Sequence, residues 1–189
     1  MTGQIKKKSG QSLVEAVFAI GILLMVVSAV LGLATSNLVG QRQSEFQVIG
    51  NNLAREGIEV VRNIRDSNWL SGLAWDTGLT GSQQALAVFH EVNNSWQLDF
   101  NILPNQDKLY LATPGGVYSH DAGSGAPSPF SRRLNFQAIC QNATGQDSIK
   151  SVCGSGEQKI GVKVRAVVNW QESSRPRQAV IEDLLYEWK

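Results

Sequence analysis

Hydrophobic residues near the N-terminus form one unbroken block. From Ala16 to Ala34 the only polar side chain is that of Ser28. As a helix rising about 1.5 Å per residue, these nineteen residues would extend about 28 Å, which matches the hydrocarbon core of a bilayer. Three lysines precede the block: Lys6, Lys7 and Lys8. They predict that the short N-terminal end stays in the cytoplasm and that the chain after the block lies outside.

A helical pattern continues beyond the block. Apolar or small residues recur at helical spacing at Phe46, Ile49, Gly50, Leu53, Gly57, Val60, Val61 and Ile64. Polar residues occupy the opposite side: Gln47, Asn51, Arg55, Glu59, Arg62 and Asp66. The pattern predicts one helix from Ser12 to Asp66 whose outer half packs on a folded domain. The two glycines in the stripe predict a close approach of a sheet.

Short β-prone segments separated by turn residues follow the helix. The expected strands are 85–92 and 96–103 as one hairpin, 109–113 and 117–120 as a second, then 134–140, 159–170 and 179–188. The expected connections are 70–84, 121–129 and 173–177. Strict alternation fails at Glu182 and Asp183, which predicts a bulge there. One long helix followed by antiparallel hairpins indicates an α+β fold in which a sheet packs across the helix.

Glu15 is an ionisable residue at the entrance of the apolar block. A carboxylate in lipid costs about 2.5–3.5 kcal/mol on insertion scales, so this one needs a partner. One interpretation is a capping box with Ser12. A second is a secretory signal peptide cleaved after Ala34, and a third is a plain single-pass anchor. An acid inside the hydrophobic region and a helix that continues past it both fit a signal peptide poorly.

The segment Gly10-Gln11-Ser12-Leu13-Val14-Glu15 before an apolar helix resembles the prepilin signal of type IV pilins and type II secretion pseudopilins. The resemblance implies that a prepilin peptidase cleaves between Gly10 and Gln11 and methylates the new amino terminus on Gln11. It also implies that Glu15 pairs with that terminus of a neighbouring subunit during assembly. The family fold, a long helix as the handle of a ladle with a sheet as its bowl, agrees with the pattern of elements.

Two departures favour a minor pilin or pseudopilin over the bulk subunit. Gln11 stands where major pilins usually carry phenylalanine, and the apolar block lacks proline. The segment from Asn52 to Trp69 is similar to the outer helix of minor pilins. The resemblance implies as partners the prepilin peptidase, other pilin subunits, an assembly platform and its ATPase, and the membrane. It places the chain in the cytoplasmic membrane and then in an extracellular or periplasmic filament.

The sequence therefore divides into four expected parts. They are a leader peptide 1–10, a membrane or filament-core helix 11–40, an amphipathic helix 41–68 and a sheet domain 69–189.

Charge and cysteine content add two constraints. The 189-residue chain has 17 basic and 16 acidic residues, and removal of residues 1–10 would leave 14 − 16 = −2. This near balance indicates no particular partner. Cys140 and Cys153 lie in the part expected outside the cytoplasm, which favours a disulfide over a pair of free thiols.

Candidate chemistry is sparse. No nucleotide-binding, hydrolase, metalloprotease or redox motif occurs, so we expect neither an enzyme nor a cofactor or metal site. His90 and His120 are scattered, and Asn93 and Asn142 head formal glycosylation sequons. Basic residues of the last strands could form a strip along nucleic acid, chiefly Lys159, Lys163 and Arg165. An ordinary solvated strand face is the stronger interpretation, since no aromatic residues interleave with these cations. The alternatives to a filament subunit are a membrane-tethered binding module and a DNA-uptake pseudopilin.

Overall fold

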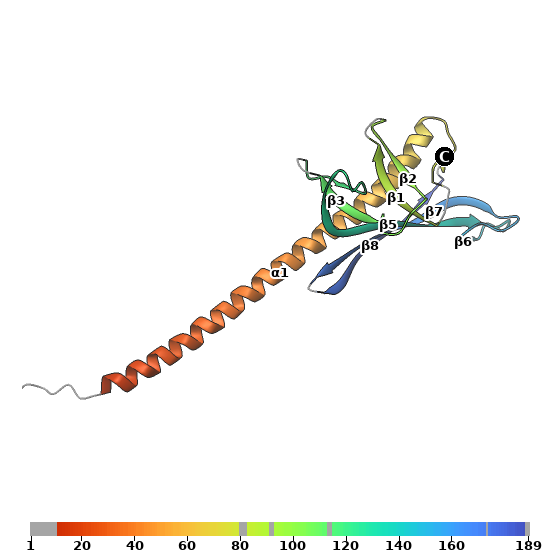
Figure 1. Cartoon of the computed structure of the whole chain (residues 1–189). Helices are drawn as coiled ribbons and strands as arrows, with labels where there is room; N and C mark the ends of the chain where they lie inside the picture. The colour runs from red at the N-terminus through yellow and green to blue at the C-terminus, as the bar shows by residue number, and fades with distance from the viewer. Residues whose placement is uncertain (1–10, 80–82, 91–92, 113–114, 173, 188–189) are drawn as a thin grey trace, which may run out of the picture. The chain divides into compact units, whose positions relative to one another are not determined.

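The computed structural model describes residues 11–79, 83–90, 93–112, 115–172 and 174–187, with residues 11 and 12 described in backbone only. The chain forms two compact units, Met1–Glu45 and Phe46–Lys189. One helix, α1 (Gln11–Leu70), runs through both. The described part of the first unit is helix alone, and the second unit contains the end of α1 and every described strand (Figure 1). The expected α+β class, a long N-terminal helix packed against an antiparallel sheet, is confirmed.

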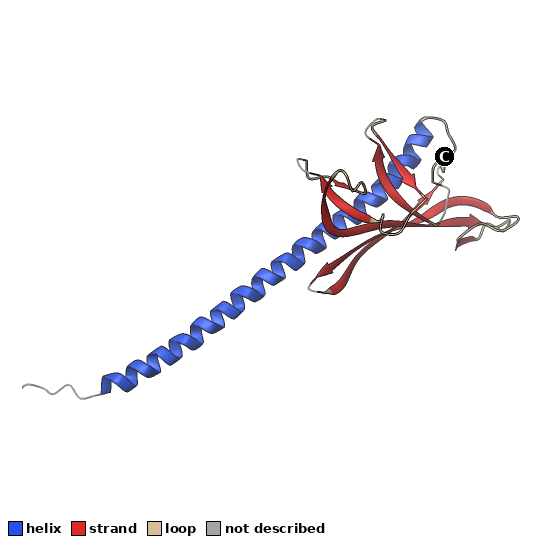
Figure 2. Cartoon of the chain, viewed as in Figure 1, coloured by secondary structure: helices blue, strands red, loops and turns tan. Residues whose placement is uncertain are grey.

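Eight strands form the sheet of the second unit. They are β1 (Gln84–His90), β2 (Ser95–Asp99), β3 (Lys108–Ala112), β4 (Tyr118–Ser119), β5 (Gly125–Gln141), β6 (Asp147–Lys150), β7 (Gln158–Glu172) and β8 (Arg175–Tyr186). The long strand β5 is central, because it pairs with β7 on one side and with β3, β1 and β6 on the other. All pairs are antiparallel, and β8 pairs with β7. Figure 2 shows the sheet curving over the last turns of the helix.

The core lies between the helix stripe and one face of the sheet. Leu53, Ile58 and Val61 are buried against the inward residues of β5 and β7, which include Leu134 and Val164. Burying each large aliphatic side chain contributes about 1.5–3 kcal/mol. The predicted stripe is confirmed, and the structure adds Ala54 and Ile58 to it.

Two glycines set the distance between helix and sheet, as the sequence predicted. A Cβ at Gly50 would lie 2.7 Å from a ring carbon of Trp170, and one at Gly57 would lie 2.8 Å from Leu134 Cδ2. Both neighbours are buried side chains, with Trp170 3% and Leu134 0% exposed. The sheet therefore occupies the space that any other residue at these positions would need.

The helix ends four residues later than predicted, at Leu70 rather than Asp66, and so two residues beyond the expected 41–68 part. Its end is a Schellman motif. Gly72 (φ +70°) donates its N–H to Trp69 O at 3.1 Å, and Leu73 donates to Asn68 O at 2.9 Å. Polar residues in the last turn concealed this continuation, since the helix end is set by the glycine and not by the apolar period.

The two predicted hairpins are confirmed with shifted ends, whereas the expected loop 121–129 is partly wrong. Strand β5 already begins at Gly125, where a Cβ would lie 2.0 Å from Leu111 O. Before Ser131 this strand pairs only with β3, so Pro127 and Pro129 lie in a segment paired on one side, where proline is tolerated. The Gly, Ser and Pro content made this strand resemble a loop.

Three smaller predictions also need correction. Strand β6 was missed within a polar segment, and Arg175 and Arg177 belong to β8 rather than to a turn. The bulge expected at Glu182 and Asp183 is absent, because the β7–β8 register is unbroken. Asp183 simply faces the helix, where its carboxylate accepts a hydrogen bond from Arg62 at 2.6 Å.

Replacing Gly50 with leucine should disrupt the helix–sheet contact. We expect Gly50→Leu to lower the free energy of unfolding by about 2 kcal/mol, within the usual range for overpacking. Urea unfolding of the full chain in detergent, followed by tryptophan fluorescence, measures the change. Gly40→Leu is the matched control, because nothing lies within 4 Å of a Cβ at Gly40. Equal effects of the two variants would contradict the close-approach role.

Candidate membrane and assembly segment

The first half of α1 has a continuous apolar surface. Every described residue from Leu13 to Glu45 is exposed except Gly21, which is half-buried, and one 18-residue window has a mean hydropathy of 2.8. Exposed side chains of this size are unfavourable in water, whereas a lipid or protein environment would cover them. This helix is long and apolar enough to cross a membrane.

Three hydroxyl groups within this surface are satisfied by the helix itself. The hydroxyl of Ser28 donates to Met25 O at 2.9 Å, and that of Thr35 donates to Gly32 O at 2.9 Å. Ser44 donates to Gly40 O at 3.0 Å. Because unsatisfied polar groups are costly in lipid, these internal bonds make the segment compatible with a bilayer.

Glu15 is the only charged residue between Gln11 and Gln41. It is exposed, and it has no hydrogen bond or ion pair with the described residues. Its carboxylate therefore lies on an apolar helix surface without an intramolecular partner in the described part of the chain. If the surface is covered by lipid or protein, a partner has to come from elsewhere.

The predicted processing residues lie at the border of the described chain. Gly10 and the leader lysines, Lys6, Lys7 and Lys8, are outside the described residues. The described part of α1 begins at Gln11, so Ser12 and Glu15 both lie in its first turns.

The predicted disulfide between Cys140 and Cys153 is confirmed, with Cα atoms 5.5 Å apart. It joins the end of β5 to the loop that precedes β7. The turn from β5 into β6 is held by Asn142, whose Oδ1 accepts hydrogen bonds from the N–H groups of Thr144 and Gln146. The bridge thus secures a polar segment that buries little of its own surface.

An interaction that the sequence did not reveal connects the sheet to the helix. The side chain of Arg132 on β5 is 1% exposed, and its Nη1 lies 3.0 Å from Glu56 Oε1. The same nitrogen donates to Leu53 O at 3.3 Å. Arg132 is two residues from Phe130 and two from Leu134, and residues two apart in a strand lie on the same face. This spacing could have placed Arg132 on the core face. Its role is structural, because a buried cation is tolerated only when it is paired.

The three residues of the expected basic strip are paired with carboxylates. Lys163 lies 2.8 Å and Arg165 lies 3.2 Å from Glu182, and the hydrogen bond from Lys163 lowers the pKa of that carboxyl. Lys159 lies 2.8 Å from Asp76 and stands over the ring of Trp75 at 5.1 Å from its centroid. Lys159 therefore holds the connector after α1 against the sheet, and the other two form a local pair with Glu182.

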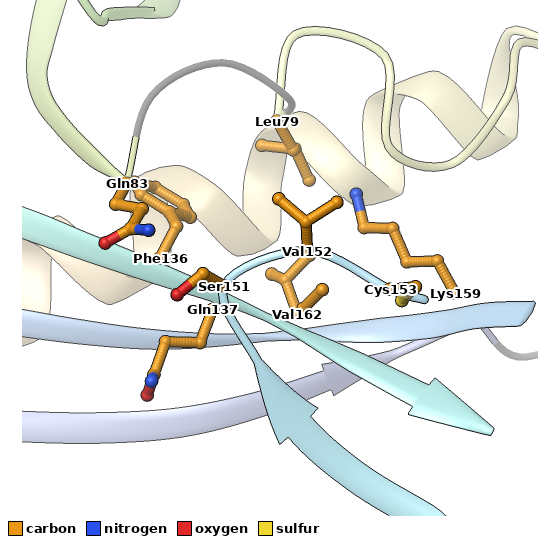
Figure 3. Close-up of a pocket in the computed structure, with 10 residues that line it drawn as sticks. Leu79, Gln83, Phe136, Gln137, Ser151, Val152, Cys153, Lys159 and Val162 are labelled. Carbon is orange, nitrogen blue, oxygen red and sulfur yellow. The ribbon is translucent and has the colours of Figure 1, made fainter. Parts of the chain in front are cut away.

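A cavity of about 310 Å³ lies between that connector and the disulfide loop (Figure 3). Its lining is mainly apolar and consists of Leu79, Gln83, Phe136, Gln137, Ala138, Ser151, Val152, Cys153, Lys159 and Val162. The charged group in this lining, the Lys159 amine, is already paired with Asp76. The described residues of this lining include no His, Asp or Glu that could act as a general acid or base.

The two histidines are not brought together. His90 is exposed on β1, whereas His120 is half-buried after β4 with its Nδ1 3.1 Å from Gln106 O. Among the described residues, no group of three or more His, Cys, Asp or Glu side chains could hold a metal ion. Burial, with the charge of Arg132 as the second cause, lowers the pKa of His120 from 6.5 to about 4.

No protein-family model matches the chain, and no curated protein or solved structure is significantly similar to it. The function is therefore inferred from the fold, the helix surface and the sequence motif from Gly10 to Glu15.

The His120 environment predicts a pH dependence of stability. Between pH 6.5 and 4 the unfolded chain protonates this histidine and the folded chain does not. The free energy of unfolding should therefore fall by roughly 1–3 kcal/mol as pH decreases through this range. Urea unfolding at several pH values measures it, and His120→Gln should flatten the slope while His90→Gln leaves it unchanged. Equal slopes in all three proteins would contradict the assignment.

Proposed function

We propose that the chain is a structural subunit, a minor pilin or pseudopilin, of a type IV pilus or a type II secretion-like filament. One observation carries the proposal. A single helix begins at Gln11, presents an apolar surface with one carboxylate at Glu15, and from Phe46 onward packs on a sheet. A subunit that passes from a bilayer into a filament of packed helices needs such a surface, because each environment has to cover the same apolar side chains.

Glu15 has the defining role in this mechanism. In lipid its charge costs about 2.5–3.5 kcal/mol, and pairing with a cation at the assembly site would offset that cost. The cation we propose is the amino terminus of a neighbouring subunit, created at Gln11 by cleavage after Gly10. Docking is then favoured over remaining in the bilayer, and the helix surfaces pack as the filament forms.

Processing precedes assembly in this mechanism. The lysines Lys6, Lys7 and Lys8 hold the leader in the cytoplasm. A prepilin peptidase removes residues 1–10 and methylates Gln11. An assembly platform and its ATPase then supply the work of extracting the subunit from the cytoplasmic membrane.

Two other functions have less support. A membrane-tethered binding module would use the same anchor, but it gives the lone carboxylate no role. Binding of DNA would use the cations of the outer strands, where Lys163 and Arg165 share the carboxylate of Glu182 and keep one net positive charge. Fractionation separates these functions, since a pilin appears in sheared filaments and a tethered module stays with membranes.

Maturation should depend on Gly10. We expect the mature chain to begin at Gln11 with a methylated amine, and Gly10→Val to leave the leader attached, because a β-branched side chain would alter the Ser-Gly-Gln junction at the proposed cut. N-terminal sequencing and intact mass of the purified chain decide both points. Any mature start other than Gln11 rejects the assignment.

Assembly should depend on Glu15. We expect Glu15→Ala to be cleaved and inserted normally but to enter sheared filaments at no more than a tenth of the normal level. Glu45→Ala is the control, since Glu45 is also an exposed acid of the first unit but lies outside the apolar block. Immunoblots of sheared and membrane fractions give the ratio. Normal incorporation of Glu15→Ala would contradict the assembly role and leave Glu15 with a capping role at the start of the helix.

A further inference from the structure

Strand β8 leaves one edge of the sheet open. Its twelve residues pair with β7 in an unbroken register from Glu172↔Arg175 to Gly161↔Tyr186. Among the described strands β8 has no second neighbour, and Figure 1 shows it at the border of the sheet. Long, regular edges can accept another strand, and proteins usually block them with bulges, prolines or charges.

The register shows which backbone groups face outward. Glu187 donates its N–H to Ile160 O at 2.8 Å, one position beyond the Gly161↔Tyr186 pair. Hydrogen-bonded and non-hydrogen-bonded pairs alternate in an antiparallel ladder. Odd-numbered residues of β8 therefore direct their N–H and C=O groups to β7, and even-numbered residues direct theirs to the open edge.

Two observations agree with this assignment. Pro176, which has no N–H, occupies an even-numbered position. The N–H of Leu184, also even-numbered, donates to Asp183 Oδ1 at 2.9 Å and thus does not face β7. These two residues also close the outward edge at both ends. Between them the outward backbone groups of Gln178, Val180 and Glu182 are available.

We propose that this edge pairs with β8 of a second copy of the chain, antiparallel and centred on Val180. The available stretch is symmetric about Val180, so a two-fold axis there places Val180 opposite its own counterpart. It also places Gln178 opposite Glu182 of the second copy. Pro176 falls opposite Leu184, so the position without an N–H meets the one whose N–H is already used.

Side chains on both faces fit this register. On the outer face the Gln178 amide can donate to the Glu182 carboxylate of the second copy, and Val180, 38% exposed, meets an identical apolar side chain. On the inner face Arg177 comes opposite Asp183 of the second copy. No like charges face one another directly, which favours a second copy over an unrelated strand as the occupant.

The helix leaves room for this pairing. Gly57 approaches Leu134 on β5 and Ala166 on β7, so this part of α1 lies over strands inside the edge, and Arg62 contacts β8 through its side chain at Asp183. A strand added in the plane of the sheet beside β8 does not displace it. The contact is isologous and closes on two copies. It goes beyond filament assembly through the helix and stands if that function fails.

A proline at the centre of the edge tests the pairing. In Val180→Pro only an outward N–H is lost, so the β7–β8 ladder and the far-UV circular dichroism should be retained. The dissociation constant of the full-chain dimer in detergent, from light scattering across a concentration series, should rise at least tenfold. Val180→Thr keeps the N–H and is the matched control. A wild-type chain that stays monomeric, or a Val180→Pro dimer of unchanged affinity, overturns the proposal.

Cross-linking tests the register and distinguishes this contact from one between apolar helices. Mild oxidation of full-chain Val180→Cys should give a covalent dimer, because Cα atoms of directly opposed residues lie about 5.5 Å apart in a hydrogen-bonded pair. Gln137→Cys is the control, since Gln137 is exposed on β5 away from the edge. Equal cross-linking of both variants, or none at Val180, rejects pairing centred on Val180.

Discussion

The fold of the second unit depends on how closely the end of α1 approaches the sheet. Gly50 and Gly57 leave no Cβ between helix and strands, and Trp170 and Leu134 fill that space. This approach brings Arg132 within reach of Glu56, so a cation buried in the core finds its counter-charge on the helix. Removing one member of such a pair leaves an uncompensated buried charge. The stability of the core therefore depends on the helix residue and the strand residue together.

A single helix meets two different environments along its length. From Phe46 its apolar residues are covered by strands of the same chain, whereas before Glu45 the apolar residues are exposed. The hydroxyls of Ser28 and Thr35 bond to their own backbone, and Glu15 is the only charged residue between Gln11 and Gln41. The same secondary structure is thus stabilised by tertiary packing in one part and requires an external apolar environment in the other.

Sequence patterns predicted the features that follow from periodicity. The apolar block, the helix stripe with its glycines, the two hairpins and the alternation of β7 depend on local residue order. Cys140 and Cys153 could be paired because only two cysteines occur, in a part expected outside the cytoplasm. The candidate assembly residues came from a short motif, and their roles remain a proposal.

Features set by long-range contacts were missed. The strand from Gly125 to Pro129 is defined by pairing with β3, which overrides its loop-like composition. Asp183 looked like an interruption because its partner, Arg62, is distant in sequence. The burial of Arg132 was not predicted for the same reason, although its neighbours at positions two residues away are buried. Predicting a buried charge requires knowledge of its partner, and a local sequence pattern does not contain that information.

The bridge between Cys140 and Cys153 has a consequence for how the protein can vary. The segment it closes is held by a covalent bond and by the backbone of β6, not by a core of its own. Its outward residues, such as Val152, which is 78% exposed, contribute little to folding. Substitutions and small insertions there should therefore be tolerated. The segment between Cys140 and Cys153 is therefore a place in the second unit where natural variation, or an inserted peptide, should change the stability of the fold little.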